Sequence, residues 1–489
     1  MISRKVFFLI LLLLLVLLTL KGISTLDPDF GWHLRIGQLI LTLGIPQTDP
    51  FSYTMPSYHF VDHEWLTDIA LAYLYPLIGY VGIAVIFASL TLFALYLVLG
   101  RPKDLFTLSI FTLAALVLIR FQGVRPQVIS WFCLALLLRL LNSRKFRWFI
   151  PPLFLIWANL HGGFVFGLII LVIFTGVRFI TERKINLSDV VSLAMSFGVT
   201  LFNPYGLGLW QVVWESAKDS SLHSRIGEWV PFVFSFHLPS ILFLALSLSL
   251  FAKYRSKHLA WINLSCILFL IAGLITSRNF PLWVMIALPL LIQDLNLFRL
   301  EISKIKYSGA RFRKISAGLV GVVSGLLLFE SIWLGLKFAG INTSIDYPKN
   351  AVVYLRTHLP QGQIFADYDW GGYLIWQLPE KRVFIDGRMP SWRREIAPAG
   401  ESIDAFAELL AIQEHPEKSQ EILKKYDVST ILWPNPDYQP KDLFQLIKEQ
   451  LFGSKAPPKD SFIESLQSSG WKKVYSDDVS TLLQVPVRD

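Results

Sequence analysis

The stretch Val6-Phe-Phe-Leu-Ile-Leu-Leu-Leu-Leu-Leu-Val-Leu-Leu-Thr-Leu20 indicates the fold class of this chain. An uninterrupted apolar run of this kind, extended at both ends, is typical of a membrane-spanning helix. The charged start Arg4-Lys5 before an apolar core is also the pattern of a secretory signal. Because no small-residue cleavage site follows at residues 18–24 and many more apolar runs come after it, the stretch predicts an uncleaved first span.

The composition agrees with a membrane protein. The chain of 489 residues is 53% hydrophobic and only 17% charged, whereas an average soluble protein is about 45–50% apolar. Its net charge of +9 comes from short Lys and Arg clusters between apolar runs, so no basic stripe for nucleic acid is present in the sequence. Cys133 and Cys266 both lie inside apolar runs, which argues against a disulfide framework or a cysteine metal site.

Eleven apolar runs are predicted to span the membrane. They lie near residues 6–22, 80–99, 105–119, 127–142, 148–160, 163–179, 189–203, 239–252, 259–276, 281–297 and 315–336. With the N-terminus in the cytoplasm, alternate connections carry the basic clusters Arg101 and Lys103, Arg144 to Arg147, Arg183 and Lys184, Lys253 to Lys257, and 304–314. Cytoplasmic loops carry the Lys and Arg excess, so this orientation in the plasma membrane is predicted.

A second domain is expected after the last span. Strand-like runs, Gln363–Ala366, Arg382–Ile385, Thr430–Trp433, Lys473–Tyr475 and Thr481–Gln484, alternate there with helical stretches. The predicted fold is therefore an α-helical polytopic membrane domain, residues 1–340 including a first outer loop at 23–79, followed by a soluble α/β domain at 341–489. An odd number of spans places that domain outside the cytoplasm.

The connections on the outer side hold the residues capable of chemistry. They are 23–79, Arg120–Gln127, Asn159–Gly163, Asn203–Gly206 running on to Glu228–Trp229, and Ser277–Pro281. Because these loops come from distant parts of the chain and share one membrane face, we expect them to form one site.

Two carboxylates, Asp27 and Asp29, flank Pro28 directly after the first span. Proline disfavours helix in the residue before it, so Asp29 is expected to project freely at the start of an amphipathic interfacial helix, 32–43. The alternative is that Asp29 only caps that helix, since Asp is a favoured N-cap.

Candidate substrate-binding residues in the same loop are His33, Asp62, His63 and Glu64, the last three preceding a predicted helix at 66–75. Acids and imidazoles can move protons or hold a divalent cation such as Mg or Mn. Their spacing matches no established ligand motif, so both roles stay open.

Arg120, Arg125 and Arg278 stand at the ends of apolar runs. A guanidinium binds phosphate through paired hydrogen bonds, so these arginines are candidates for an anionic lipid phosphate, and snorkelling towards headgroups is the alternative. Asn159 and His161, next to two glycines, offer further hydrogen bonds, although tight packing also accounts for that motif. Asp386 and Arg388 are expected to pair with each other, with a role in acceptor recognition as the alternative.

Several motifs together resemble a known family. They are Asp27-Pro-Asp-Phe-Gly-Trp-His-Leu, Gly44-Ile-Pro, Thr48-Asp-Pro-Phe-Ser-Tyr, Asp62-His-Glu-Trp-Leu, Arg125-Pro-Gln, Trp157-Ala-Asn-Leu-His-Gly-Gly, Asn203-Pro-Tyr-Gly, Trp370-Gly-Gly-Tyr and Phe384-Ile-Asp-Gly-Arg. The set resembles bacterial membrane proteins related to glycosyltransferases of the C fold (GT-C), which include protein mannosyltransferases, aminoarabinose transferases and oligosaccharyltransferases. The resemblance covers most of the chain.

The resemblance implies that an acid in the first outer loop serves as catalytic base or orients the acceptor. Asp29 occupies the matching position and is the first candidate for this role, with Asp27 second. Many relatives have an Asp-Glu pair there, whereas this chain has Asp29-Phe30. The expected activity is transfer of a sugar from a polyprenyl-phosphate donor in the membrane to a glycan, lipid or protein acceptor on the outer side, with no nucleic-acid partner.

Two rival functions come from other classes. A lipid or polysaccharide transporter would place ionisable groups near the bilayer midplane, whereas here the polar motifs lie at one surface. A non-catalytic assembly protein for surface glycans would tolerate loss of both Asp27 and Asp29.

Overall fold

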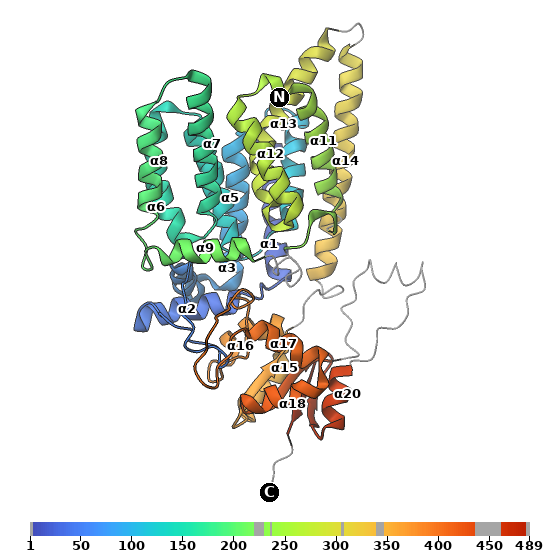
Figure 1. Cartoon of the computed structure of the whole chain (residues 1–489). Helices are drawn as coiled ribbons and strands as arrows, with labels where there is room; N and C mark the ends of the chain where they lie inside the picture. Colours follow the sequence, from blue (N-terminus) through green and yellow to red (C-terminus); the bar gives the residue numbers. More distant parts are fainter. Residues whose placement is uncertain are drawn as a thin grey trace. The chain divides into compact units, whose positions relative to one another are not determined.

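The computed structural model describes residues 3–219, 229–234, 237–304, 308–338, 347–435 and 461–485. The chain divides into two compact units (Figure 1). The helical unit comprises Met1–Ser24, His63–Thr67 and Ile78–Gly335, and the mixed unit comprises Thr25–Asp62, Asp68–Leu77 and Leu336–Asp489.

The helical unit consists of apolar helices. They are α1 (Arg4–Ser24), most of α3 (Trp65–Leu99), α4 (Leu105–Ile119), α5 (Gln127–Leu141), α6 (Ile150–Leu160), α7 (Phe164–Glu182), α8 (Leu187–Val199), α9 (Gly208–Lys218), α11 (Leu238–Tyr254), α12 (Ala260–Ile275), α13 (Phe280–Ser303) and most of α14 (Ser308–Phe338). Within the described residues, a helix coincides with each predicted span. In the part of the chain that the structure describes, six helical segments are long and apolar enough to cross a membrane, beginning at Arg4, Trp65, Phe164, Leu238, Ser277 and Phe312. The α-helical membrane fold is therefore confirmed.

The core of this unit is built on α4 and α13. All residues of α4 from Leu108 to Ile119 are buried, and the helices α11 and α12 both pack against α13. Trp131, Trp157 and Trp283 are among its largest fully buried side chains. Large apolar side chains that are exposed on α1, α7 and α14 form the outer surface that a bilayer would cover.

The helix α3 is two helices joined at a kink. Gly79 has a φ of 64°, a left-handed conformation that favours glycine, and Pro76 lies in the preceding turn. The kink separates the helix predicted at 66–75 from the span predicted at 80–99. It also marks the change from the mixed unit to the helical unit, which falls between Leu77 and Ile78.

The mixed unit contains a sheet of strand order β1-β2-β4-β3 in its described part. The strands are β1 (Gln363–Ala366), β2 (Val428–Pro434), β3 (Lys472–Ser476) and β4 (Ser480–Gln484). β1 and β2 are parallel, with Phe365 opposite Ile431, and the β2–β4 and β4–β3 pairs are antiparallel. The helices of this unit are α2 (Phe30–Leu43), α15 (Lys349–Thr357), α16 (Gly371–Gln377), α17 (Ala405–Glu414), α18 (Pro416–Lys425) and α20 (Ser461–Ser468).

Four of the five predicted strands are confirmed, and the one at Arg382–Ile385 is wrong. Val383 makes only an isolated parallel bridge, to Ser52. Its N–H donates to Phe51 O at 2.9 Å and its carbonyl accepts from Tyr53 N at 3.0 Å. Because a loop from far earlier in the chain takes up these backbone groups, the run does not join the sheet.

The greater part of the predicted first outer loop packs with the C-terminal residues. An added Cβ on Gly31 would lie 2.0 Å from the Gly372 carbonyl oxygen, which shows how closely α2 and α16 approach. Tyr347 Oη donates to Leu26 O at 2.9 Å. The structure thus places residues 25–62 with the α/β fold, whereas the sequence-based division at residue 340 grouped them with the membrane helices.

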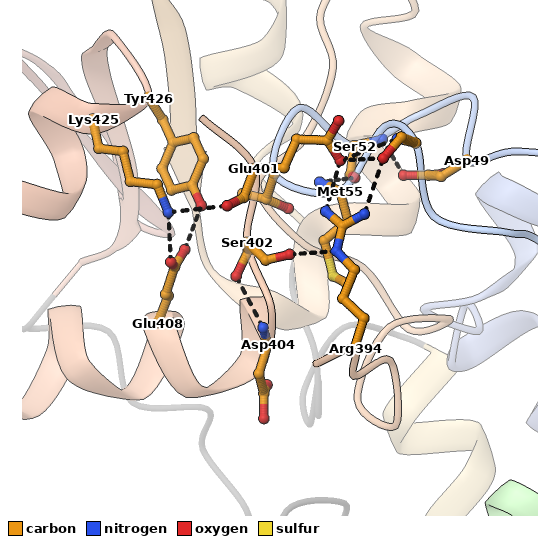
Figure 2. A network of polar contacts seen from close by, with 12 residues as sticks. Asp49, Ser52, Met55, Arg394, Glu401, Ser402, Asp404, Glu408, Lys425 and Tyr426 are labelled. Atoms are coloured by element: carbon orange, nitrogen blue, oxygen red, sulfur yellow. Dashed lines mark hydrogen bonds and ion pairs between the residues drawn. The ribbon is translucent and has the colours of Figure 1, made fainter. Parts of the chain in front are cut away.

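A polar network holds the second half of this loop (Figure 2). Arg394 Nη2 donates to Glu401 Oε2 at 2.7 Å, and the Ser57 hydroxyl donates to the same oxygen at 2.7 Å. Figure 2 shows Arg394 and Glu401 next to the segment that contains Asp49, Ser52 and Met55. The Glu401 carboxylate and the Arg394 guanidinium therefore hold this part of the loop in place through side-chain hydrogen bonds, without the ladder of a regular strand.

Candidate active site

Four polar segments meet at one end of the helical unit. The Phe121 and Phe280 rings stack at 6.4 Å, which joins the turn after α4 to the start of α13. Trp65 Nε1 donates to Asn159 Oδ1 at 2.9 Å, and Asn159 Nδ2 donates to Phe202 O at 3.0 Å. Ser130 Oγ, which lies 2.7 Å from His161 Nδ1, joins these two pairs of segments. The contacts therefore bring together residues 63–67, 120–130, 159–163 and 277–280, as expected from their shared position at span ends.

Glu64 lies between two imidazoles in this region. Its Oε1 is 3.3 Å from His161 Nε2 and 3.6 Å from His63 Nε2. The Glu64 side chain is only 6% exposed, whereas that of His63 is 39% exposed. The arrangement connects a buried carboxylate to an imidazole that solvent or substrate can reach.

A hydrogen-bonded chain sets the tautomer of His161. Trp157 Nε1 donates to Ser130 Oγ at 2.8 Å, Ser130 Oγ lies 2.7 Å from His161 Nδ1, and Gly163 N donates to the same Nδ1 at 2.9 Å. Because Nδ1 accepts, the proton of the neutral ring is on Nε2 and faces Glu64. A Cβ at residue 163 would lie 2.3 Å from Ser130 Oγ, so glycine is needed there.

Ser130 and Trp157 were not among the predicted site residues. Ser130 lies within a predicted span, where a single hydroxyl carries no distinctive pattern, and Trp157 belongs to the motif of Asn159 and His161 but has no titratable group that would single it out. The nearest sequence signal was the position of Ser130, which lies about one helical turn after Gln127 and shortly after the turn that contains Arg125.

The three candidate arginines are all in the helical unit, but they differ in exposure. Arg120 follows the last residue of α4 and is exposed, whereas Arg125 and Arg278 are half-buried. Arg278 lies in a short 3-10 turn, Ser277–Asn279, whose first N–H donates to Val230 O at 3.0 Å. These guanidinium groups give this end of the unit positive charge suited to an anion.

The two candidate acids lie in the mixed unit. Asp27 is 5% exposed and its Oδ1 accepts from Asp29 N at 2.9 Å. Asp29 occupies the N-cap position of α2, but its carboxylate makes no capping hydrogen bond to a backbone N–H among the described residues. Its Oδ1 instead accepts from Trp32 Nε1 at 2.9 Å. The capping explanation of Asp29 is therefore wrong.

The Asp29 carboxylate is held from two sides and half-buried. An added Cβ on Gly387 would lie 1.9 Å from its Oδ1, so this glycine allows the carboxylate to approach the backbone. The second oxygen, Oδ2, has no hydrogen-bond partner within the part of the chain that the structure describes. One oxygen is thus fixed and the other is available to accept a proton.

Three neighbouring groups of the mixed unit have raised pKa values, and the charge of Asp29 contributes to the rise for Asp369 and Tyr368. Desolvation and then the charge of Asp29 raise the pKa of Asp369, although that residue remains exposed at the surface. Desolvation and then the charge of Asp369 raise the pKa of Asp367 to about 6. Burial also raises the pKa of Tyr368, with Asp29 as the second cause. The region carries concentrated negative charge.

Asp386 and Arg388 pair, as expected. Arg388 Nη2 is 2.7 Å from Asp386 Oδ2 and 2.9 Å from Asp49 Oδ1. Burial raises the pKa of Asp386, while the adjacent guanidinium opposes that rise. Although burial disfavours its charge, Asp386 and Asp49 raise the pKa of Arg388. The group is a structural ion cluster that joins the early loop to the α/β fold.

His33 and Asp62 are enclosed by the fold. His33 Nδ1 is 2.7 Å from Asp68 Oδ1, and the two side chains are 3% and 0% exposed. This pair joins α2 to the first turns of α3. Asp62 is 2% exposed. Within the described residues, no three His, Cys, Asp or Glu side chains are grouped to hold a metal ion.

No protein-family model matches the chain, and no curated protein is similar to it by sequence. Three solved structures of the oligosaccharyltransferase of Archaeoglobus fulgidus are similar to it over 88% of its length. The form tethered to an acceptor peptide with the NVT sequon has a TM-score of 0.56 at 11% identity, with 69% of that chain covered. AglB in complex with an inhibitory peptide and a dolichol-phosphate has a TM-score of 0.54 at 12% identity, with 70% covered.

The apo form of the same enzyme has a TM-score of 0.58 at 10% identity, again with 70% of that chain covered. Identities this low carry information about the fold alone. The chain therefore has the membrane fold of these archaeal oligosaccharyltransferases, as expected from its resemblance to glycosyltransferases of the C fold.

Proposed function

We propose that this protein is a membrane glycosyltransferase that transfers a sugar from a polyprenyl-phosphate donor to an acceptor on the outer side of the plasma membrane. The observation that carries the proposal is the Asp29 carboxylate, with Oδ1 held by Trp32 and Oδ2 unpartnered among the described residues. The fold likeness supports it, since one of the similar enzymes was solved with a dolichol-phosphate and an inhibitory peptide.

In the proposed reaction, Asp29 Oδ2 accepts the proton of the acceptor nucleophile as that nucleophile bonds to the anomeric carbon. The bond from the anomeric carbon to the donor phosphate breaks, and the lipid phosphate leaves with the electron pair. General-base assistance of this kind is worth about 10²–10⁴-fold in rate. Trp32 and Gly387 contribute by holding the carboxylate in one orientation.

The helical unit would bind the donor. We propose that Arg120, Arg125 and Arg278 hold the lipid phosphate, because charge stabilisation of a leaving phosphate favours the transition state. His63, whose side chain is 39% exposed, would offer hydrogen bonds to sugar hydroxyls, while Asn159, His161 and Glu64 would position it through the contacts they make within this region. A divalent cation, Mg or Mn, held partly by the donor's own phosphate remains part of the proposal.

The proposal is tested with Asp29→Asn in a complemented deletion strain, scored for surface glycan and lipid-linked sugars at normal protein level. We expect a loss of about 10²-fold or more in glycan. Asp404→Asn is the matched control, because Asp404 does cap its helix through Ala407 N at 2.9 Å and Asn can replace it.

Normal glycan in Asp29→Asn would remove Asp29 from the mechanism. If the double variant with Asp27→Asn were also normal, a non-catalytic assembly role would replace the enzyme proposal.

A further inference from the structure

A cavity of about 90 Å³ lies within the helical unit, where α11 and α12 pack against α13 (Figure 1). Most of its wall is apolar, and Leu248 lines it from α11, Leu270 from α12 and Leu290 from α13. The proposed glycosyl transfer uses none of its lining residues.

Three polar atoms on this wall lack a hydrogen-bond partner among the described residues. They are Asp294 Oδ2, Ser247 Oγ and Trp283 Nε1. Asp294 and Trp283 are each 1% exposed, and Ser247 is 6% exposed. Buried polar groups in native proteins nearly always have a partner in the protein or in ordered water, so the three atoms point to an occupant of the cavity.

One of the three atoms belongs to a buried pair of ionisable side chains. Asp294 Oδ1 lies 2.6 Å from His258 Nε2, and both side chains are 1% exposed. Ionisable groups inside a membrane-spanning bundle are costly, and a buried pair is stable only when further hydrogen bonds satisfy its remaining lone pairs. A donor to Asp294 Oδ2 would therefore stabilise the pair.

The three atoms differ in what they require, and this determines the occupant. Asp294 Oδ2 requires a donor, Trp283 Nε1 requires an acceptor, and the Ser247 hydroxyl can donate or accept. An acyl chain from the membrane meets none of these requirements. A metal cation requires several oxygen ligands, whereas the Trp283 N–H can only donate.

Water meets all three requirements, because it both donates and accepts hydrogen bonds. Cavities that stay empty are lined by apolar groups, whereas this one has three polar atoms on its wall. At about 30 Å³ for each water molecule, the cavity has room for about three.

We propose that this cavity is a hydration site, in which about three ordered water molecules hydrogen-bond to Asp294, Ser247 and Trp283. The water completes the hydrogen bonding of Asp294 and so stabilises its pair with His258 inside the helix bundle. The site is independent of the proposed sugar transfer.

The test is hydroxyl-radical footprinting of the full-length protein in phosphatidylcholine nanodiscs. A brief X-ray pulse converts water into hydroxyl radicals where the water lies, so a buried side chain is oxidised where ordered water touches it. Cys266 and Trp283 line the cavity. Cys133 is the matched control within the native protein, since it is 3% exposed against 6% for Cys266 and does not line the cavity. Oxidised peptides are identified by mass spectrometry.

Two variants separate the cavity from the rest of the bundle. Ala287→Leu places a larger side chain in the cavity, because Ala287 lies on its wall. Ala252→Leu makes the same change on α11 at an exposed position that does not line the cavity.

We expect Cys266 to be oxidised several-fold more than Cys133 in the native protein, with Trp283 oxidised as well. The same pattern should remain in Ala252→Leu, whereas oxidation of Cys266 and Trp283 should be lost in Ala287→Leu. Equal oxidation of Cys266 and Cys133, or unchanged oxidation of Cys266 in Ala287→Leu, would each overturn the proposal. The comparison of the two cysteines uses the native protein and so does not depend on how the variants fold.

Discussion

Arg388 is a single charged residue that is surrounded by acids and aromatic rings. Its side chain is 2% exposed and contacts Asp49 and Asp386. The guanidinium carbon also lies 5.1 Å from the centroids of Phe51 and Phe60, within cation–π range. These contacts join residues that are more than three hundred positions apart in the chain, so the cluster stabilises the pairing of the early loop with the α/β fold.

We predict that Arg388→Gln destabilises the protein by about 3–5 kcal/mol, because it leaves two buried carboxylates without their cation. Arg393→Gln is the control, since Arg393 is 40% exposed and pairs with Asp404 at the surface, where such a pair is worth about 1 kcal/mol or less. The measurement is the thermal unfolding midpoint in detergent, followed by tryptophan fluorescence. Equal shifts in the two variants would show that Arg388 is not essential to the fold.

At the scale of the element, α2 has two glycines at close backbone contacts. Gly31 faces the Gly372 carbonyl, and an added Cβ on Gly37 would lie 1.9 Å from the Asp68 carbonyl oxygen in α3. The spacing of apolar residues predicted this helix, and both of its ends agree closely, but the same spacing also suggested an interfacial helix. In the structure, the buried residues of α2 are Phe30 to Leu34, Ile36, Gly37 and Ile40.

Gly37→Ala is expected to cost about 1–3 kcal/mol or more, because the methyl group forces α2 away from α3. The change should also lower glycan production if Asp29 must be held at the start of the same helix. Gly325→Ala in α14 is the control, where nothing lies within 4 Å of the added Cβ and helix propensity favours alanine by up to about 1 kcal/mol.

Unfolding midpoints of the two glycine variants should therefore move in opposite directions. A Gly37→Ala midpoint at or above that of the native protein would contradict the close contact between the helices.

At the scale of the whole molecule, the proposed function requires a defined orientation in the membrane. The basic connections are predicted to face the cytoplasm, and the polar loops and the C-terminal residues are predicted to face outward. Alkaline phosphatase, which is active only after export, should be inactive when fused after Lys184 and active when fused after Gly206 or Asp489. Activity in the reverse pattern would end the proposal of an outward-facing donor site.

Much of the architecture could be predicted from consecutive residues. Apolar length and helical spacing located the spans, the amphipathic stretches and four of the strands, because these features depend on interactions within a few residues of the chain. The same local patterns identified Asp27, Asp29, His63, Glu64 and His161 as residues with useful chemistry.

Tertiary contacts decided the rest. Local patterns could not show that residues 25–62 pack with the α/β fold, that Ser130 sets the tautomer of His161, or that Gly387 supports the carboxylate of Asp29. Each of these features depends on hydrogen bonds or close backbone approaches between distant residues, and such contacts leave no periodic signal in the segments that make them.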